Sequence, residues 1–307
     1  RSTLSSSSAA SDVYKRQLIV FLYILIVYPI VGSWQWGGGF LSTFTDEVGF
    51  YDFAGSTLVH SVGGWGGLVI IYLLGARKGK FDSSGKAIAI PGSNIPLSAA
   101  GVLILWLGWF GFNGGSVLSA DPANTSLVLV TTCLAAAAGG LGATFLSTLM
   151  YKNLDITMFM NGVLGGLVGI TAGADQMGPT SAILIGAIGG AIVVLGVALL
   201  DKCKLDDPVG AIPVHLFAGI WGTLAVGLFG ASAGFDQFMV QLSSTGIVGA
   251  FCVVGAAIIA LIVKAIMGLR VSEEEEEIGL DISEHGTKAC LLYTSDAADE
   301  EDSVDLG

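Results

Sequence analysis

The sequence predicts an all-α, polytopic membrane protein, and three observations support that prediction. The 307-residue chain is 53% hydrophobic and 12% charged, with a mean hydropathy of +0.76, whereas a soluble domain carries about 25% charged residues because its surface faces water. Its 45 glycines are spread through apolar runs, where small residues let membrane helices approach one another closely. Basic residues of the apolar body recur only in alternate connections between those runs.

Eight apolar stretches are candidate transmembrane helices. Most of them approach the ~20 residues needed to cross ~30 Å of hydrocarbon at ~1.5 Å per residue. The first is short, as if its beginning were truncated. The stretches lie at about 18–33, 50–75, 97–118, 126–150, 157–173, 180–200, 209–230 and 243–268.

The connections between these stretches fall into two classes by charge. Lysine and arginine follow the second, fourth, sixth and eighth stretches, and the alternate connections contain neither. The positive-inside rule makes the basic side cytoplasmic. We therefore expect a multi-pass protein of the plasma or inner membrane with a cytoplasmic C-terminus. The basic residues are Arg77, Lys78, Lys80, Lys86, Lys152, Lys202, Lys204, Lys264 and Arg270.

The two ends of the chain change composition abruptly against the apolar body. We interpret 1–17 and 290–307 as non-native extensions derived from adapter or vector sequence, although native disordered tails have similar serine-rich and acidic compositions. The expected organisation is then a transmembrane domain over 18–268 and a cytoplasmic tail over 269–289. The acidic run Glu273–Glu277 is expected to be a solvated part of that tail.

Two of the three histidines lie inside predicted spans. His60 and His215 each follow an aspartate, Asp52 and Asp207, at a distance of eight residues, and each is followed by glycines at matching positions. This is a short internal repeat with an offset of 155 residues. The matching glycines are Gly64 with Gly219, and Gly67 with Gly222.

The charge pattern gives the two halves of this repeat opposite directions through the membrane. Each histidine lies ~12 Å along its helix from its aspartate, so the imidazoles approach the midplane from opposite sides. Inverted repeats with a site at the midplane are common in secondary transporters, and an intramembrane polar residue is a functional hypothesis by default. Two alternatives remain: unrelated packing histidines, and bis-histidine haem ligation, for which neither span supplies an arginine or lysine.

The chain resembles the Amt/Rhesus family of ammonium transporters over nearly all of residues 18–289. The segment DFAGSTLVHSVGGWGGLVIIYLLGAR (52–77) is similar to the family signature, GWFGFNGGS (108–116) to a second characteristic stretch, and LRVSEEEEEIGLDISEHG (269–286) to the family's cytoplasmic tail. The resemblance implies a homotrimer in which each protomer has its own pore and eleven helices. This chain would supply the last eight helices, without the first three and one of two gate phenylalanines.

The resemblance also implies roles for three residues near the outer mouth, and it favours the Amt branch over the Rhesus branch. Trp36 would hold the cation on its ring face, Ser116 would accept a hydrogen bond from it, and Phe112 would be the remaining gate aromatic. Without the resemblance, Trp36 is typical of an interfacial belt residue and Ser116 of a local backbone partner. Phe112 would then be core filling.

In the implied mechanism, the vestibule deprotonates ammonium, and His60 and His215 form the hydrogen-bonded pair that lines an apolar pore for ammonia. Both imidazoles are expected to be neutral, because burial disfavours the charged form. Asp52 would support the site structurally and electrostatically. Asp207, its repeat mate on the cytoplasmic side, reads equally well as a helix cap.

We therefore expect ammonium transport rather than enzymatic activity, and no cofactor. The alternative is an ammonium sensor or regulatory protein on the same fold with little flux. No P-loop motif appears, so primary active transport is not supported, and the four cysteines have no paired spacing that would indicate a disulfide framework or a zinc site. The expected partners are ammonium, the lipid membrane and two further protomers, with a PII-class signal protein at the cytoplasmic face and no nucleic acid.

Overall fold

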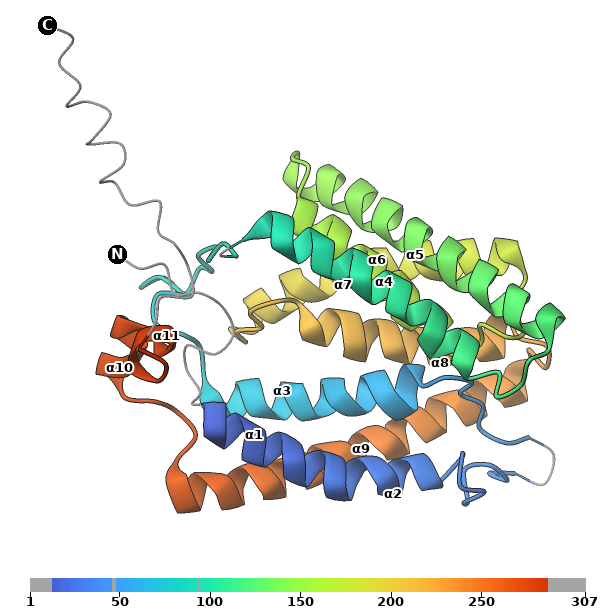
Figure 1. The fold of residues 1–307 in the computed structure, drawn as a ribbon, viewed down its shortest axis with the longest axis horizontal. Helices are drawn as coiled ribbons and strands as arrows, with labels where there is room; N and C mark the ends of the chain where they lie inside the picture. The colour runs from blue at the N-terminus through green and yellow to red at the C-terminus, as the bar shows by residue number, and fades with distance from the viewer. Residues whose placement is uncertain (1–12, 46–47, 93, 287–307) are drawn as a thin grey trace, which may run out of the picture.

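The computed structural model describes residues 13–45, 48–92 and 94–286 of the chain (Figure 1). Within those residues the regular structure is helical, apart from one isolated antiparallel bridge between Phe81 and Ala87. This confirms the predicted all-α fold class. Seven of the described helices are long and apolar enough to cross a membrane, and the fifth predicted stretch forms a shorter apolar helix.

The helices follow the order of the predicted stretches. Three short π-helical segments (η1, η2 and η3) interrupt or begin the helical spans. The elements are α1 (Val13–Leu22), η1 (Tyr23–Val27), α2 (Tyr28–Ser33), η2 (Ser56–Ser61), α3 (Val62–Leu74), α4 (Ile95–Gly115), α5 (Pro122–Tyr151), α6 (Ile156–Ile170), α7 (Pro179–Lys202), η3 (Ile212–Phe217), α8 (Ala218–Phe229), α9 (Phe235–Met267), α10 (Glu273–Ile278) and α11 (Leu280–Ser283).

The starts of three spans differ most from the prediction, and the second span begins at Ser56 rather than at 50. The first span begins at Val13 rather than at 18, inside the segment interpreted as an extension, while residues 1–12 and the extension 290–307 lie outside the described residues. The last span begins at Phe235 rather than at 243. Its first turns contain glutamines that lower the hydropathy, but Gln241 is buried and hydrogen-bonds both backbone groups of Tyr51. A polar residue with internal partners is compatible with a buried helix.

Side-chain caps or prolines mark where the four helices α4 to α7 begin. Asn94, Asp121 and Asp155 accept hydrogen bonds from backbone N–H groups in the first turns of α4, α5 and α6. These bonds satisfy donors that have no partner within the helix. Proline stands in the first turn of α4, α5 and α7, where its missing N–H costs nothing.

Glycine allows α5, α6 and α7 to pack with their backbones in contact. A β-carbon at Gly166 of α6 would lie 2.1 Å from the carbonyl oxygen of Ala135, and one at Gly190 of α7 would lie 2.0 Å from that of Gly139. Both contacts are shorter than any real carbon–oxygen approach, so only glycine fits. This three-helix group forms a rigid wall behind the two histidine-bearing helices.

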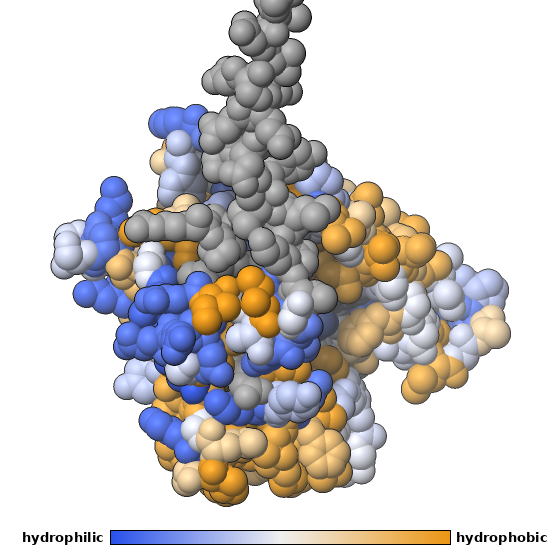
Figure 2. Space-filling model, turned by 60° about the vertical axis from the view of Figure 1, so that its left-hand side comes forward, coloured by the Kyte–Doolittle hydropathy of each residue, from blue (hydrophilic) through white to orange (hydrophobic). Residues whose placement is uncertain are grey.

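The connections that carry basic residues meet at one end of the molecule. Lys80 pairs with Asp201 at 3.0 Å, and Lys78 contacts the acidic tail. Figure 1 shows α10 and α11 beside the C-terminal end of α3. In Figure 2, which brings this end forward, hydrophilic residues gather over it and hydrophobic residues cover the flanks.

The acidic run Glu273–Glu277 is not simply solvated, so that expectation is wrong in part. It forms α10, which begins with a capping box from Ser272 and Glu275. Glu276 is 1% exposed and pairs with Arg270 at 2.7 Å. The guanidinium compensates the buried carboxylate, so this residue of the run is not solvated.

Candidate functional site

His60 and His215 are in direct contact at the centre of the helical bundle. Their Nδ1 atoms lie 3.2 Å apart, and the rings are nearly parallel, with centroids 5.2 Å apart and an angle of 18° between planes. Each histidine lies on a π-helical segment, η2 or η3. Such segments occur frequently at functional sites because they change the direction of a side chain relative to an ordinary helix.

Glycines bring these two segments together. A β-carbon at Gly64 would lie 2.7 Å from the Leu216 side chain, and one at Gly219 would lie 2.5 Å from the Ser56 carbonyl oxygen. Gly64 and Gly219 are therefore points where the two histidine-bearing helices approach each other closely, whereas Gly222 packs against the Gly169 carbonyl oxygen of α6. Without side chains at these positions, the imidazoles reach hydrogen-bonding distance.

Asp52 and Asp207 occupy equivalent places at the beginnings of the two histidine-bearing helices. The carboxylate of Asp52 accepts hydrogen bonds from four backbone N–H groups (55–58) at 2.8–2.9 Å. That of Asp207 accepts them from four groups (209–212) at 2.7–3.3 Å. A glycine with positive φ follows three residues after each aspartate, Gly55 at 113° and Gly210 at 77°, a conformation that glycine adopts without strain.

Burial and capping act in opposite directions on these two carboxylates. Burial raises the pKa of Asp52 and of Asp207, while the backbone N–H groups lower it, and burial is the larger effect at both positions. Neither side chain is hydrogen-bonded to His60 or His215. Both aspartates therefore position the helices that carry the histidines.

Two aromatic rings cover the other side of His60. Trp109 stacks on the imidazole with centroids 5.0 Å apart and an angle of 13°, and Phe112 lies 5.6 Å away. The indole N–H of Trp109 donates to Thr171 Oγ1 at 3.0 Å, which fixes the ring. Nε2 of His60 is buried and has no hydrogen-bond partner. This nitrogen therefore lies unpaired beside the apolar rings of Trp109 and Phe112.

The sequence reasoning did not assign a role to Trp109, although a usable signal was present. Trp109 precedes Phe112 by three residues in the quoted stretch GWFGFNGGS, and residues three apart lie on one helix face. Phe112 itself is 37% exposed. Trp109 and Phe112 lie edge-to-face, 5.7 Å apart, and form a joint aromatic wall.

Trp36 and Ser116 lie at the end of the molecule opposite the tail. Nε1 of Trp36 donates to the backbone carbonyl of Asp52 at 2.9 Å, and the side chain is 45% exposed. Its ring also approaches Gly55, so Trp36 lies directly above the cap of η2. Ser116 Oγ donates to the carbonyl of Phe112 at 2.8 Å, the local bond that the residue type alone suggested, and its lone pairs stay available to an external donor.

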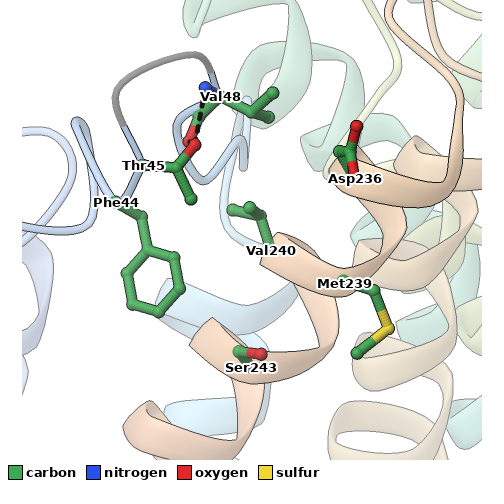
Figure 3. A pocket seen from close by; sticks show the side chains of 7 residues that line it. All are labelled: Phe44, Thr45, Val48, Asp236, Met239, Val240 and Ser243. Atoms are coloured by element: carbon green, nitrogen blue, oxygen red, sulfur yellow. Dashed lines mark hydrogen bonds between the residues drawn. The ribbon is translucent and has the colours of Figure 1, made fainter.

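A separate open cavity lies near the same end of the molecule. It measures about 460 Å³ and lies between Phe44, Thr45 and Val48 on one side and the first turns of α9 on the other (Figure 3). In Figure 3, Phe44 and Met239 border the cavity from its two sides, and Val48 N donates to Thr45 Oγ1 at 2.8 Å. Neither histidine lines this cavity. It is therefore distinct from the histidine contact.

Comparison with known proteins gives one consistent family. The "Ammonium Transporter Family" model matches residues 2–290. Ammonium transporter Amt2 of Archaeoglobus fulgidus is 43% identical over 86% of this chain and 61% of its own length. A putative ammonium transporter of Synechocystis is 42% identical over 92% of this chain and 65% of its own length.

Solved structures show the same fold. A "Sensor Amt Protein" superposes with a TM-score of 0.86 at 34% identity, over 90% of this chain and 71% of that chain. Mep2 of Saccharomyces cerevisiae superposes with a TM-score of 0.76 at 28% identity, over 86% of this chain and 63% of that chain. The chain thus spans about two thirds of the length of these relatives, and it belongs to the ammonium transporter family.

Proposed function

We propose that this chain forms most of a pore that transports ammonium across a membrane as ammonia. The observation that carries the proposal is the direct Nδ1–Nδ1 contact of His60 and His215, 3.2 Å long, within an apolar and aromatic wall. A paired polar contact at the centre of apolar helices has little structural need, because apolar packing would be at least as stable. A small neutral molecule with both a lone pair and N–H donors fits such a contact.

The Nδ1–Nδ1 contact restricts the protons of a neutral pair. One Nδ1 donates and the other accepts, so one imidazole carries its proton on Nδ1 and the other carries it on Nε2. The two Nε2 atoms are then one acceptor and one donor. Ammonia donates and accepts hydrogen bonds, so it pairs with either ring as it passes, and the buried Nε2 of His60 that lacks a partner is the place for one such contact.

Trp36, Phe112 and Ser116 would recruit and select the ion before this pair. The exposed ring of Trp36 holds a cation for about 0.5–2 kcal/mol, and Ser116 lone pairs accept one of its N–H groups. Ammonium then transfers a proton to solvent at the outer mouth, before the aromatic wall of Trp109 and Phe112. A bare cation in hydrocarbon is far less stable than neutral ammonia, so deprotonation precedes the narrow section.

We propose that Trp36 faces the outside of the cell and that the tail is cytoplasmic. The basic connections and α10 share one end of the molecule, because Lys78 and Lys80 bind residues of the tail and of α7. The positive-inside rule makes that end cytoplasmic. Cysteines introduced at Ser83 and Asp121 should react with impermeant reagents from opposite sides, and reaction of both from outside would contradict the proposed topology.

About a third of the length of the relatives has no counterpart in this chain, and this part concerns how the protomer is completed and assembled. We propose that three further helices complete an eleven-helix protomer, that protomers form a homotrimer, and that a PII-class protein docks on the cytoplasmic end. The support is the family membership and the shared span of 61–71%. Mass determination in detergent, with and without a purified PII-class protein, tests both assemblies.

Uptake of labelled methylammonium into proteoliposomes tests the function. The sample is a chimera in which the part of Archaeoglobus fulgidus Amt2 that this chain does not cover completes the sequence. Saturable uptake that ammonium inhibits supports transport. Ammonium binding by calorimetry without uptake would instead favour a sensor, as one structural relative is named. The 307-residue chain alone serves as the incomplete control.

A further inference from the structure

Each histidine-bearing helix is anchored one residue before its capping aspartate. Tyr51 precedes Asp52, and both of its backbone groups bond to the buried amide of Gln241, at 2.9 Å and 2.7 Å. Asp206 precedes Asp207, and its carboxylate is bound by Arg77 from the end of α3. The two anchors occupy the same position in the repeat but use different chemistry.

The Arg77–Asp206 contact fixes both distance and direction. Nε of Arg77 donates to Oδ2 at 2.7 Å, its terminal nitrogen donates to Oδ1 at 2.8 Å, and its backbone N–H donates to Oδ2 at 2.9 Å. The side chains are 6% and 2% exposed. Bidentate guanidinium–carboxylate pairs add geometric specificity to their strength.

Asp206 stays ionised in this contact. Burial alone would raise its pKa, but the hydrogen bonds and charge of Arg77 outweigh burial and hold the pKa below its usual value. Both partners are therefore charged at neutral pH, and loss of either leaves a buried charge without its counterion.

The α3 end that supplies Arg77 is itself held on both sides. The guanidinium of Arg270 donates to the carbonyls of Leu74 and Ala76, at 3.1 Å and 2.8 Å. Glu276 accepts the backbone N–H of Lys78 at 2.8 Å. These contacts hold the backbone on both sides of Arg77, and Arg77 in turn holds the Asp206 carboxylate in place.

We propose that Arg77 is a positioning residue for His215: through Asp206 and the adjacent Asp207 cap, it sets the position of η3 along its axis and hence the separation of the two imidazoles. Asp206 and Asp207 share a peptide unit, Asp207 caps the amides that lead into η3, and His215 lies within η3. The imidazole contact has little slack. From 3.2 Å, a shift of about 0.4 Å removes a hydrogen bond.

Three variants distinguish a role of Arg77 in positioning η3 from an effect on the overall stability of the protein. Arg77→Gln removes the guanidinium, and Arg77→Lys keeps the charge without the planar fork. Lys80→Met is the matched control, because Lys80 joins the same α3–α4 connection to Asp201 at 3.0 Å and acts on Asp206 only through its charge, which lowers the pKa of Asp206 less than Arg77 does. All are made in the completed chimera.

The first readout is hydrogen–deuterium exchange, which does not depend on transport. Exchange of backbone amides reports local opening. Arg77→Gln should accelerate exchange over residues 207–216 by about tenfold or more and leave 52–61 unchanged. Arg77→Lys should be intermediate, and Lys80→Met should match the parent. Equal acceleration in both segments, or none over 207–216, would overturn the proposal.

The second readout rests on the proposed function. Arg77→Gln should reduce the maximal ammonium current per folded protein about tenfold while the half-saturation stays unchanged, because Trp36 lies at the opposite end. If the parent chimera carries no current, the transport proposal fails, while the exchange experiment still decides the anchoring of η3. A changed half-saturation with an unchanged maximum would also count against positioning.

A second variant covers failure of Arg77→Gln to fold. Arg77→Met combined with Asp206→Leu removes both charges and keeps apolar packing, which is often neutral for stability. It should fold, exchange rapidly over 207–216 and conduct poorly. Parent-like exchange and current in this double variant would show that the ion pair only balances buried charge.

Discussion

Removal of either pore histidine should abolish transport, but the two removals should differ in stability. His215→Ala leaves Nδ1 of His60 without its partner at 3.2 Å, next to an Nε2 that already has none. An unpaired buried group costs about 1–3 kcal/mol. The lost ring contact between the two imidazoles adds about 0.5–1.5 kcal/mol by analogy with aromatic pairs.

His60→Ala should be the more destabilising change. His60 stacks on Trp109 as well as on His215, with centroids at 5.0 Å and 5.2 Å. Among the described residues, His215 stacks on His60 alone. Because His60 has this additional stacking partner, the free energy of unfolding should fall by about 0.5–1.5 kcal/mol more in His60→Ala than in His215→Ala. In the double variant neither imidazole is stranded, so its stability loss should be smaller than the sum of the single losses.

The assay combines thermal unfolding with ammonium-driven current in proteoliposomes of the completed chimera. His285→Ala is the control, because His285 is the third histidine and is exposed. Each single variant should lose the current while remaining folded, and the double variant should conduct no worse than the worse single variant, because groups that act as a unit are non-additive. Near-normal current in either single variant, with additive stability losses, would refute the paired-histidine pore.

Three further changes test other parts of the structure. Trp36→Leu should raise the half-saturation for ammonium by up to about tenfold, since the cation–π face is lost; an unchanged value returns Trp36 to the interfacial belt. Gly190→Ala should lower stability by about 1–3 kcal/mol in thermal unfolding, because its β-carbon would lie 2.0 Å from a backbone oxygen of α5, whereas Gly101→Ala, which meets no atom within 4 Å, should have little effect. Burial raises the pKa of Asp175, so the folded state binds its proton more tightly than the unfolded chain does, and the stability of the parent relative to Asp175→Asn should fall as pH rises above about 4. The asparagine keeps an acceptor for the Tyr51 hydroxyl, and a pH-independent difference in melting temperature would contradict this prediction.

The amino-acid sequence by itself determined the membrane class, the order of the helices and the two histidines as the centre of the site. Span length and the alternation of basic connections depend on local composition, so they are readable without tertiary structure. The repeat of aspartate, histidine and glycine could be recognised for the same reason, because the spacing of residues along a helix fixes their relative positions before the helix packs against another. The short motifs of this chain were sufficient to indicate the ammonium transporter family to which it belongs.

Only the tertiary structure decided which of these residues touch and what holds them. The π-helical segments and the stacking of Trp109 on His60 depend on how helices distant in sequence pack. Glu276 illustrates the physical reason most clearly. An acidic run is expected in water from composition alone, but the free energy of burying one carboxylate depends on whether a guanidinium such as that of Arg270 lies within hydrogen-bonding distance, and the pairing of residues from different elements is set by the fold.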